Sequence, residues 1–367
     1  MKKILLTFFL VMLLSLGGFF FLKAKKLKIF PSQAEIGNNV DQRVLNSFKG
    51  VIDFKFERPI IQTNGENNQN IPLSQSNSNE KKEDSKELDK NNNLTFAILG
   101  DTQSFDVKNS KGNFQKAAAS IQKLNPDIVI SAGDLISTCA DHCAQKFSEW
   151  KSIAGPFLGK TYAAQGNHDR FENDSADSIW QNAFNFPLNG PTGFLETTYS
   201  FDFKNSHFVF LSSDKPEEHK INQTQRSWLE QDLLKNQKEN VFIIFHEPAY
   251  PVSNKKGESL DAEPSERNAL WEILDRHNVT AVINGHEHIV SRRKITSSVS
   301  SIAKNNIYQF IFGNTDSFNH DLPAAGVAEY ASQIQGSFGL VKVNGKEITV
   351  EVYDPNGKLL NTFTFSK

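Results

Sequence analysis

The sequence predicts an α/β layered fold, with β-sheets flanked by helices and an antiparallel block at the C-terminal end. From residue 94 onward, apolar runs of strand length alternate with amphipathic segments of helix length. After Gly285 the helical segments stop, and apolar runs follow that are separated by Asn-Gly turns. The chain of 367 residues is 38% hydrophobic and contains 30 phenylalanines, which supplies enough apolar surface for a sizeable core.

The first 93 residues divide into three segments. Residues 4–22 carry no charge, and as a helix they would cover about 28 Å of bilayer. We therefore expect a membrane anchor with its basic flank over residues 1–31, with a cleaved signal peptide or a buried helix as alternatives. Residues 32–61 form a short juxtamembrane segment, and residues 62–93 predict a disordered polar linker because they hold few large apolar residues. The ordered domain spans residues 94–367.

Lysines on both sides of the predicted anchor compete in setting its orientation. A short basic N-terminus ahead of a long apolar run is the usual start of an exported chain. We therefore expect the protein to be anchored in a membrane with its body outside the cytoplasm.

Each element of the domain is predicted from the spacing of its apolar residues. Strands are expected over residues 94–99, 128–131, 161–164, 208–212, 241–245 and 279–283. Helices are expected over residues 114–124, 147–153, 222–234 and 265–277, and Asn222 and Pro264 are helix-opening signals. Strands over residues 308–312, 339–343, 349–353 and 361–365 would make up the antiparallel block.

Polar motifs follow five of the predicted strands. They are Gly100-Asp101-Thr102-Gln103, Gly133-Asp134, Gly166-Asn167-His168-Asp169, His246-Glu247-Pro248 and Gly285-His286-Glu287-His288. Ligand sites in open α/β sheets lie outside the carboxyl ends of the strands, so we expect these loops to converge on one edge. Carboxylate, imidazole and amide groups suit Mn, Fe or Zn ions, and the lack of cysteine argues against a structural zinc site. Each motif alone has an ordinary alternative as a helix cap or a turn.

In order and in spelling, these motifs resemble the signature of the calcineurin-like metallophosphoesterase superfamily, which reads D-x-H, GD, GNH(D/E), H and GHxH. The resemblance covers residue 94 to the C-terminus. It implies a metallophosphoesterase-like fold that binds two divalent or mixed-valence metal ions. By motif position, one ion would bind Asp101, Gln103 and His288, the other would bind Asn167, His246 and His286, and Asp134 would bridge the two.

One departure from the family pattern is Gln103, which stands where many members have histidine. Some branches of the superfamily resemble this chain in having D-x-Q. An amide oxygen is a poorer donor than imidazole, so we expect weaker binding of the first metal ion.

The resemblance implies a metal-dependent hydrolase of phosphoester bonds, either a phosphatase or a phosphodiesterase, in which a metal-bridging hydroxide attacks phosphorus in line. His168 would stabilise the transition state or protonate the leaving oxygen, and Asp169 would orient His168. The alternative is a non-catalytic metal- or phosphate-binding module on the same fold. A formal net charge of −2 gives no global field for nucleic acid, so the expected partners are a phosphoester substrate and the membrane.

Several other residues suggest sites but are weaker candidates. Cys139 and Cys143 offer too few ligands for structural zinc, and for an exported body a local disulfide is favoured over two free thiols. His320 lies in a polar loop that would either overhang the metals or lie on the surface. Structural or solvated roles are expected for three more histidines, His207, His219 and His277.

Overall fold

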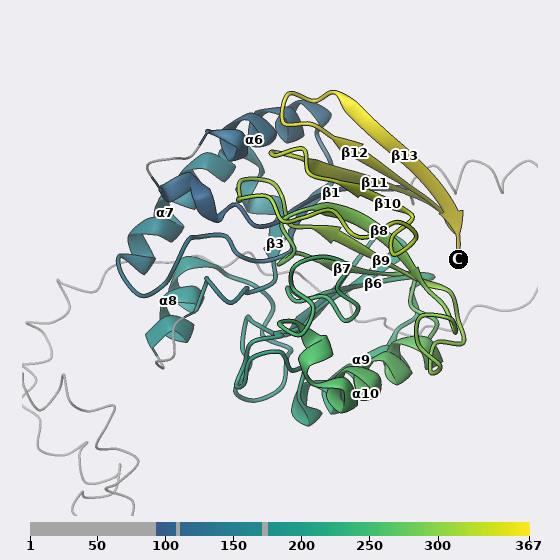
Figure 1. The fold of residues 1–367 in the computed structure, drawn as a ribbon. Coiled ribbons are helices and arrows are strands. Elements are labelled where there is room, and N and C mark those ends of the chain that lie inside the picture. Colours follow the sequence, from purple (N-terminus) through teal and green to yellow (C-terminus); the bar gives the residue numbers. More distant parts are fainter. Residues whose placement is uncertain (1–92, 108–110, 171–174) are drawn as a thin grey trace, which may run out of the picture. The chain divides into compact units, whose positions relative to one another are not determined.

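The computed structural model describes residues 93–107, 111–170 and 175–367, which build two mixed β-sheets with helices on their outer faces (Figure 1). The predicted anchor, juxtamembrane segment and nearly all of the linker lie outside the described residues. Within the part of the chain that is described, no helix is both long enough and apolar enough to cross a bilayer.

The first sheet has six strands in the order β13-β12-β11-β1-β2-β3. Its parallel half is β1 (Leu94–Leu99), β2 (Ile128–Ser131) and β3 (Thr161–Ala163). Its antiparallel half is β11 (Phe338–Asn344), β12 (Glu347–Tyr353) and β13 (Leu359–Ser366). The Asn344-Gly345 turn joins β11 to β12, and Gly345 has φ 59°, a left-handed backbone that favours glycine.

The second sheet has seven strands in the order β10-β8-β9-β7-β6-β5-β4. Its strands are β4 (Tyr199–Phe203), β5 (Ser206–Phe210), β6 (Asn240–Ile244), β7 (Ala281–Asn284), β8 (Val290–Ile295), β9 (Ile307–Phe312) and β10 (Tyr330–Ser332). The central strands β5, β6, β7 and β9 run parallel, and β4, β8 and β10 add antiparallel edges.

Helices cover the outer face of each sheet, as Figure 1 shows. On the side of the first sheet lie α6 (Asn113–Leu124), α7 (Cys143–Ala154) and α8 (Ser175–Ala183), and beside the second lie α9 (Gln223–Lys235) and α10 (Pro264–Arg276). Short 3-10 helices are η2 (Gln103–Asp106), η3 (Gly155–Lys160) and η4 (Leu260–Ala262). The predicted opening signals are confirmed: the Asn222 side chain accepts from the backbone N–H of Gln225 at 3.2 Å, and α10 begins at Pro264.

The two sheets pack against each other around a shared core. The central strands of the second sheet are also buried on their other face, by helices. In β5, Phe208 belongs to the cluster between the sheets, and Val209 packs under the helices of the other face. Phe96 of β1 makes edge contacts with the rings of Phe208 and Phe242, at centroid distances of 5.3 and 5.0 Å. This burial on both faces explains why the strands appear as continuous apolar runs in the sequence.

Two expectations about the architecture need correction. The loops that carry the polar motifs come from two facing sheets, not from one edge of a single sheet. Residues 308–312 belong to β9 of the second sheet, where they pair with β7 and β8, so the C-terminal antiparallel block consists of β11 to β13 alone. An apolar run predicts a strand but does not predict which sheet the strand joins, because the run would be buried in either sheet.

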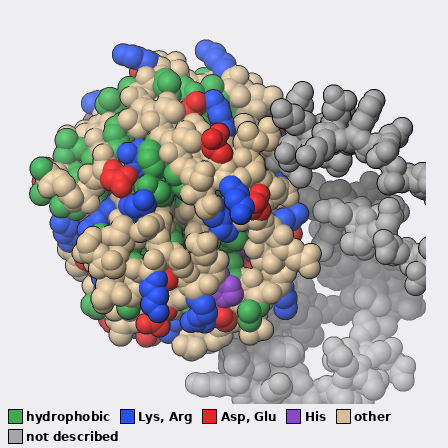
Figure 2. Space-filling view, turned by 90° about the vertical axis from the view of Figure 1, so that its right-hand side faces the viewer, with side chains coloured by type: hydrophobic (Ala, Val, Ile, Leu, Met, Phe, Trp, Pro, Cys, Tyr) green, Lys and Arg blue, Asp and Glu red, His purple; other side chains and the backbone are tan. Residues whose placement is uncertain are grey.

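Charged side chains of both signs lie intermixed over the face drawn in Figure 2. This face therefore carries both signs of charge, and the formal net charge of the whole sequence is −2. Attraction of an anionic ligand to this face would depend on local groups.

Candidate metal centre

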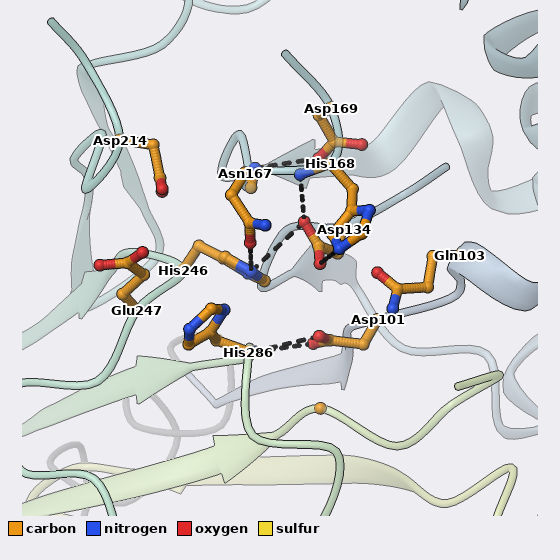
Figure 3. Close-up of polar contacts among 12 residues, drawn as sticks. Asp101, Gln103, Asp134, Asn167, His168, Asp169, Asp214, His246, Glu247 and His286 are labelled. Atoms are coloured by element: carbon orange, nitrogen blue, oxygen red, sulfur yellow. Dashed lines mark hydrogen bonds and ion pairs between the residues drawn. The ribbon is translucent and has the colours of Figure 1, made fainter. Parts of the chain in front are cut away.

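The polar motifs meet at the carboxyl ends of strands from both sheets (Figure 3). Asp101 and Asp134 follow β1 and β2 of the first sheet, and His246 and His286 follow β6 and β7 of the second. Ligand atoms of Asp101, Asp134 and His246 all lie within 4.8 Å of one another, and all three residues are buried. The predicted convergence is therefore confirmed, although it takes place between two sheets.

Asp134 lies at the centre of this group. Its Oδ1 is 3.3 Å from Nε2 of His246 and accepts a hydrogen bond from the backbone N–H of His168 at 3.0 Å. Nε2 of His246 also lies 3.1 Å from Oδ1 of Asn167. Asp134 thus contacts residues from the loops after β3 and β6, a position that suits a bridging ligand.

A second set of side chains gathers around Asp101. Its carboxylate accepts the backbone N–H of His286 at 3.0 and 3.1 Å, and its Oδ1 lies 3.5 Å from Nε2 of His288. Nε2 of Gln103 is 3.2 Å from the same His288 nitrogen, and Oε1 of Gln103 is buried and has no hydrogen-bond partner among the described residues. A buried amide oxygen with no partner is the kind of atom that a cation would satisfy.

The three imidazoles of the group are each held by a backbone carbonyl through one ring nitrogen. The contacts are His246 Nδ1 to Ala132 O at 2.9 Å, His286 Nε2 to Glu258 O at 2.8 Å, and His288 Nδ1 to Phe318 O at 2.7 Å. A carbonyl can only accept, so the bonded nitrogen carries a proton, and binding of a metal ion falls to the other nitrogen of each ring. This outer hydrogen bond is typical of histidines that bind metal.

The backbone is strained where these side chains are presented. Asp101, Asp134 and His286 have φ values of 52°, 51° and 66°, in the left-handed region that L-residues rarely adopt. The glycines of the motifs leave room for the carboxylates. A Cβ atom at Gly166 would lie 2.2 Å from Oδ1 of Asp134, and one at Gly285 would lie 2.3 Å from Oδ2 of Asp101.

Burial and neighbouring charges shift the pKa values of the acidic and basic side chains in the group. Burial raises the pKa of Asp101 well above its ordinary value, whereas at Asp134 burial is outweighed by the neighbouring His246, which lowers the pKa. Burial opposes the charged ring of His246, but the attraction of Asp134 exceeds that effect and raises the pKa of His246 to about 10. Burial and the nearby His320 lower the pKa of His288 to about 3, which keeps that ring neutral and able to donate its lone pair.

His168 stands beside Asp134 with its ring partly open to solvent. Its side chain is 40% exposed, and its Nε2 lies 3.9 Å from Oδ2 of Asp134. Its Nδ1 is 2.5 Å from the carbonyl oxygen of Ser137, so the proton sits on Nδ1 and Nε2 is an acceptor when the ring is neutral.

Asp169 has a different position from the one expected for a partner of His168. Its carboxylate is buried and accepts the backbone N–H groups of Leu135, Ile136 and Gly166 at 2.8, 3.1 and 2.9 Å. These hydrogen bonds join the loop after β2 to the loop after β3. The group that hydrogen-bonds the His168 ring is a backbone carbonyl, so the expected orienting role of Asp169 needs correction: it positions loops.

Residues outside the predicted set also shape the site. Glu287, between the two motif histidines, accepts the backbone N–H groups of Val252 and Ser253 at 2.8 and 2.5 Å and so holds the loop after β6. Asp214 and Glu247 are buried on the Asn167 and His246 side of the centre (Figure 3). The sequence carried a signal for Asp214, because it too follows a strand, β5.

A cavity of about 630 Å³ opens beside the centre. Its wall brings together groups from the loops after β2, β3 and β5, namely Thr138, Asn167, His168, Arg170, Asp214, Pro216 and Glu218. The cavity therefore places solvent-accessible space next to the exposed ring of His168.

The weaker candidates all have structural partners. Cys139 and Cys143 form a disulfide, as favoured. The ring of His320 stacks on that of His288 at a centroid distance of 4.1 Å, and its Nδ1 accepts the His288 backbone N–H at 3.1 Å. The structural role expected for the other three histidines is confirmed by carboxylate contacts, His207 with Asp202 and Asp232, His219 with Glu247, and His277 with Glu230.

The donor set fits divalent cations. It combines two carboxylates, imidazoles that each keep one nitrogen free of the backbone, and the amide side chains of Asn167 and Gln103. Such a mixture of oxygen and nitrogen donors suits borderline ions of the Mn, Fe and Zn type.

Comparison with known proteins agrees with this geometry. The family model for calcineurin-like phosphoesterases matches residues 94–290. Human tartrate-resistant acid phosphatase type 5 is 22% identical over 317 residues, which cover 73% of this chain and 89% of the relative. Purple acid phosphatase 13 of Arabidopsis thaliana is 30% identical over 147 residues, 38% of this chain and 26% of that protein.

Solved structures show the same fold. The purple acid phosphatase PPD1 from yellow lupin (Lupinus luteus) seeds superposes with a TM-score of 0.63 at 17% identity. The match covers 75% of this chain and about half, 54%, of the lupin chain. From the motifs, the convergent site and the match of the family model, we conclude that the chain belongs to the calcineurin-like phosphoesterase family.

Proposed function

We propose that this protein is a metal-dependent phosphoesterase with a dinuclear centre. Family membership supports phosphoester hydrolysis in general terms. The observation that carries the finer proposal is the set of three buried or nearly buried imidazoles. Each is held by a backbone carbonyl through one nitrogen, which leaves the other nitrogen to bind a metal ion, and His246 lies in the group that contains Asp101 and Asp134.

The residues divide into two groups around Asp134. Asp101, Gln103 and His288 would hold one ion, and Asn167, His246 and His286 would hold the other. Bound cations would polarise phosphoryl oxygens and lower the pKa of a water at this site. Asp134, which contacts the loops of both sheets, would hold the two groups together.

His168 is the residue we assign to the leaving group. Its Nδ1 is fixed by the Ser137 carbonyl, and its ring is exposed at the cavity that lies beside the centre. Protonated Nε2 would donate to an oxygen of the substrate and pass its proton to the departing alkoxide. The neutral ring can then take up another proton from solvent.

Metal analysis combined with an activity assay tests the proposal. We expect two equivalents of metal per chain and hydrolysis of an aryl phosphate such as p-nitrophenyl phosphate. Asp134→Ala should lose both activity and metal, because it removes the carboxylate assigned to bridge the two ions. Glu272→Ala, an exposed carboxylate on α10, is the matched control and should lose neither.

The alternative is a non-catalytic module that binds metal or phosphate on the same fold. Gln103 motivates it, because its amide is a weaker donor than the histidine common at this motif position. One equivalent of metal or none, with no turnover of the aryl phosphate, would favour this alternative over the enzyme.

We also propose that the body of the protein lies outside the cytoplasm, held by the predicted N-terminal anchor. The disulfide between Cys139 and Cys143 supports this location, since such bonds persist in oxidising compartments. Digestion of intact cells with a protease that does not cross membranes should remove the domain. Full protection of the domain in intact cells would argue against this location.

A further inference from the structure

The cavity beside His168 contains opposite charges that do not neutralise each other. Arg170 and Glu218 both line it. In the described part of the chain, neither side chain has an ion-pair partner, and Nε of Arg170 is buried without a hydrogen-bond partner. Among the described residues, this guanidinium and this carboxylate share one cavity without an ion pair, an arrangement that suits a ligand bearing both signs of charge.

The acidic wall is not compensated by the lysines of its own loop. Lys215 pairs with Asp177, and Lys220 pairs with Glu217. Each lysine is thus engaged with another acid, which leaves the charge of Glu218 for a molecule in the cavity.

Asp214 adds a polar group to the same wall. It is 1% exposed, its Oδ2 accepts the hydroxyl of Ser213 at 2.7 Å, and its carboxyl group shares a hydrogen bond with that of Glu247. Asp214 lines the cavity together with Asn167 and His168, which is the side where the leaving group of a substrate would sit. Buried acceptors of this kind strongly favour a ligand that supplies a donor.

We propose that this cavity selects a phosphomonoester whose leaving group is a small zwitterion, an amino acid with a phosphorylated hydroxyl. This inference rests on the proposed function. Arg170 would bind the carboxylate of the leaving group, and Glu218 and Asp214 would bind its ammonium group. The phosphoryl group would face Asn167 and His168, and water would add to phosphorus as the bond to the alcohol oxygen breaks.

Three esters of nearly equal size separate these contacts. O-phosphoserine carries both groups, O-phosphoethanolamine lacks the carboxylate, and 3-phosphoglycerate has a hydroxyl in place of the ammonium group. For the metal-loaded full-length protein, we expect kcat/KM for O-phosphoserine to be roughly tenfold or more above that for either analogue, because each analogue forgoes one charge-assisted hydrogen bond.

Variants assign each contact to its residue. Arg170→Gln should reduce the preference for O-phosphoserine over O-phosphoethanolamine about tenfold, and Glu218→Gln should reduce the preference over 3-phosphoglycerate by a similar factor. The matched controls are Arg276→Gln and Glu272→Gln, which lie outside the cavity wall and should keep both preferences.

Two results would overturn the inference while the proposed function stands. One is that the protein hydrolyses the three esters with similar kcat/KM while it is fully active on the aryl phosphate. The other is an equal decrease on all esters and on the aryl phosphate in Arg170→Gln, which would place Arg170 on the phosphoryl group. If the protein hydrolyses no ester at all, the proposed function fails, and binding decides the inference: O-phosphoserine must then raise the melting temperature more than either analogue, and Arg170→Gln must abolish the difference.

Discussion

At the scale of single residues, the site depends on which nitrogen of each imidazole carries the proton. His168 differs from the three predicted metal-binding histidines in its exposure, because its ring reaches the cavity while its Nδ1 is held by Ser137. An exposed imidazole with a fixed tautomer is suited to proton transfer, whereas a buried one is suited to coordination.

We predict that the His168→Ala variant keeps its metal and has a lower kcat. The substitution removes a proton donor without touching the predicted ligands, so kcat should fall by about 10² to 10⁴ while metal content stays unchanged. Steady-state kinetics and elemental analysis of the same preparation measure both. His277→Ala, whose ring pairs with Glu230, serves as the control. Full activity in His168→Ala would refute the assigned role.

Gln103 offers a second test at residue scale. Its Oε1 is buried and accepts no hydrogen bond from the part of the chain that the structure describes, and its Nε2 contacts the ring of His288. We expect Gln103→His to retain metal longer during dialysis against a chelator, because imidazole is the better donor for these ions. Identical metal loss from both proteins would show that Gln103 is not a ligand.

At the scale of elements, the loop between β2 and α7 links the disulfide to the site. Cys139 and Cys143 close a short loop at the start of α7, two residues after the Ser137 carbonyl that holds His168. Lys146 of α7 also donates to the carbonyl of Thr138 at 3.1 Å. These contacts tie the segment that orients His168 to a helix.

We predict that Cys139→Ser with Cys143→Ser destabilises the domain by about 2 kcal/mol, the size expected when so short a closed loop is released. Urea unfolding followed by tryptophan fluorescence measures the change. Reduction of the wild-type protein should produce the same shift. An unchanged midpoint in both experiments would mean that the loop is held by its other contacts.

At the scale of the whole molecule, stability depends on charge pairs far from the site. His207 is buried between Asp202 and Asp232, at 2.7 and 2.8 Å. Burial opposes the charged ring, but hydrogen bonds to both aspartates outweigh it and raise the pKa of His207 above its ordinary value.

The direction of that shift determines a pH dependence. A raised pKa in the folded state contributes stability that is complete below the unfolded pKa, about 6.5, and is lost as the pH rises through the folded value. We therefore expect His207→Gln to lower the free energy of unfolding by on the order of 1 kcal/mol more at pH 5.5 than at pH 9. Denaturant titrations at both pH values measure it. An equal effect at the two pH values would contradict the assignment.

A truncation tests the predicted domain boundary. Residues 94–367 contain both sheets and the cores on their faces. A protein that begins at residue 93 should fold and hydrolyse the aryl phosphate at the rate of the full chain. Circular dichroism and kinetics provide the measurement. An aggregated product would indicate that the preceding segments contribute to the fold.

The sequence alone predicted most of the central strands and the donors that follow them. The apolar runs, the helical periods and the glycines before Asp134 and Asn167 are all local patterns, which can be recognised from residues close together in the chain. The sequence was weaker where an element is short or charged. The strands β4, β8 and β10 and helix α8 were missed, and β8 holds Arg292, Arg293 and Lys294 in succession.

The tertiary structure decided what depends on distant contacts. It showed that the motifs come from two facing sheets, that Asp169 binds backbone amides of two loops, and that a carbonyl of another loop holds His168. It also brought Arg170 and Glu218, 48 positions apart in the chain, to one cavity. Local residue patterns record burial and backbone preference, but the neighbours of a side chain across a core depend on how the sheets pack, and no local pattern contains that information.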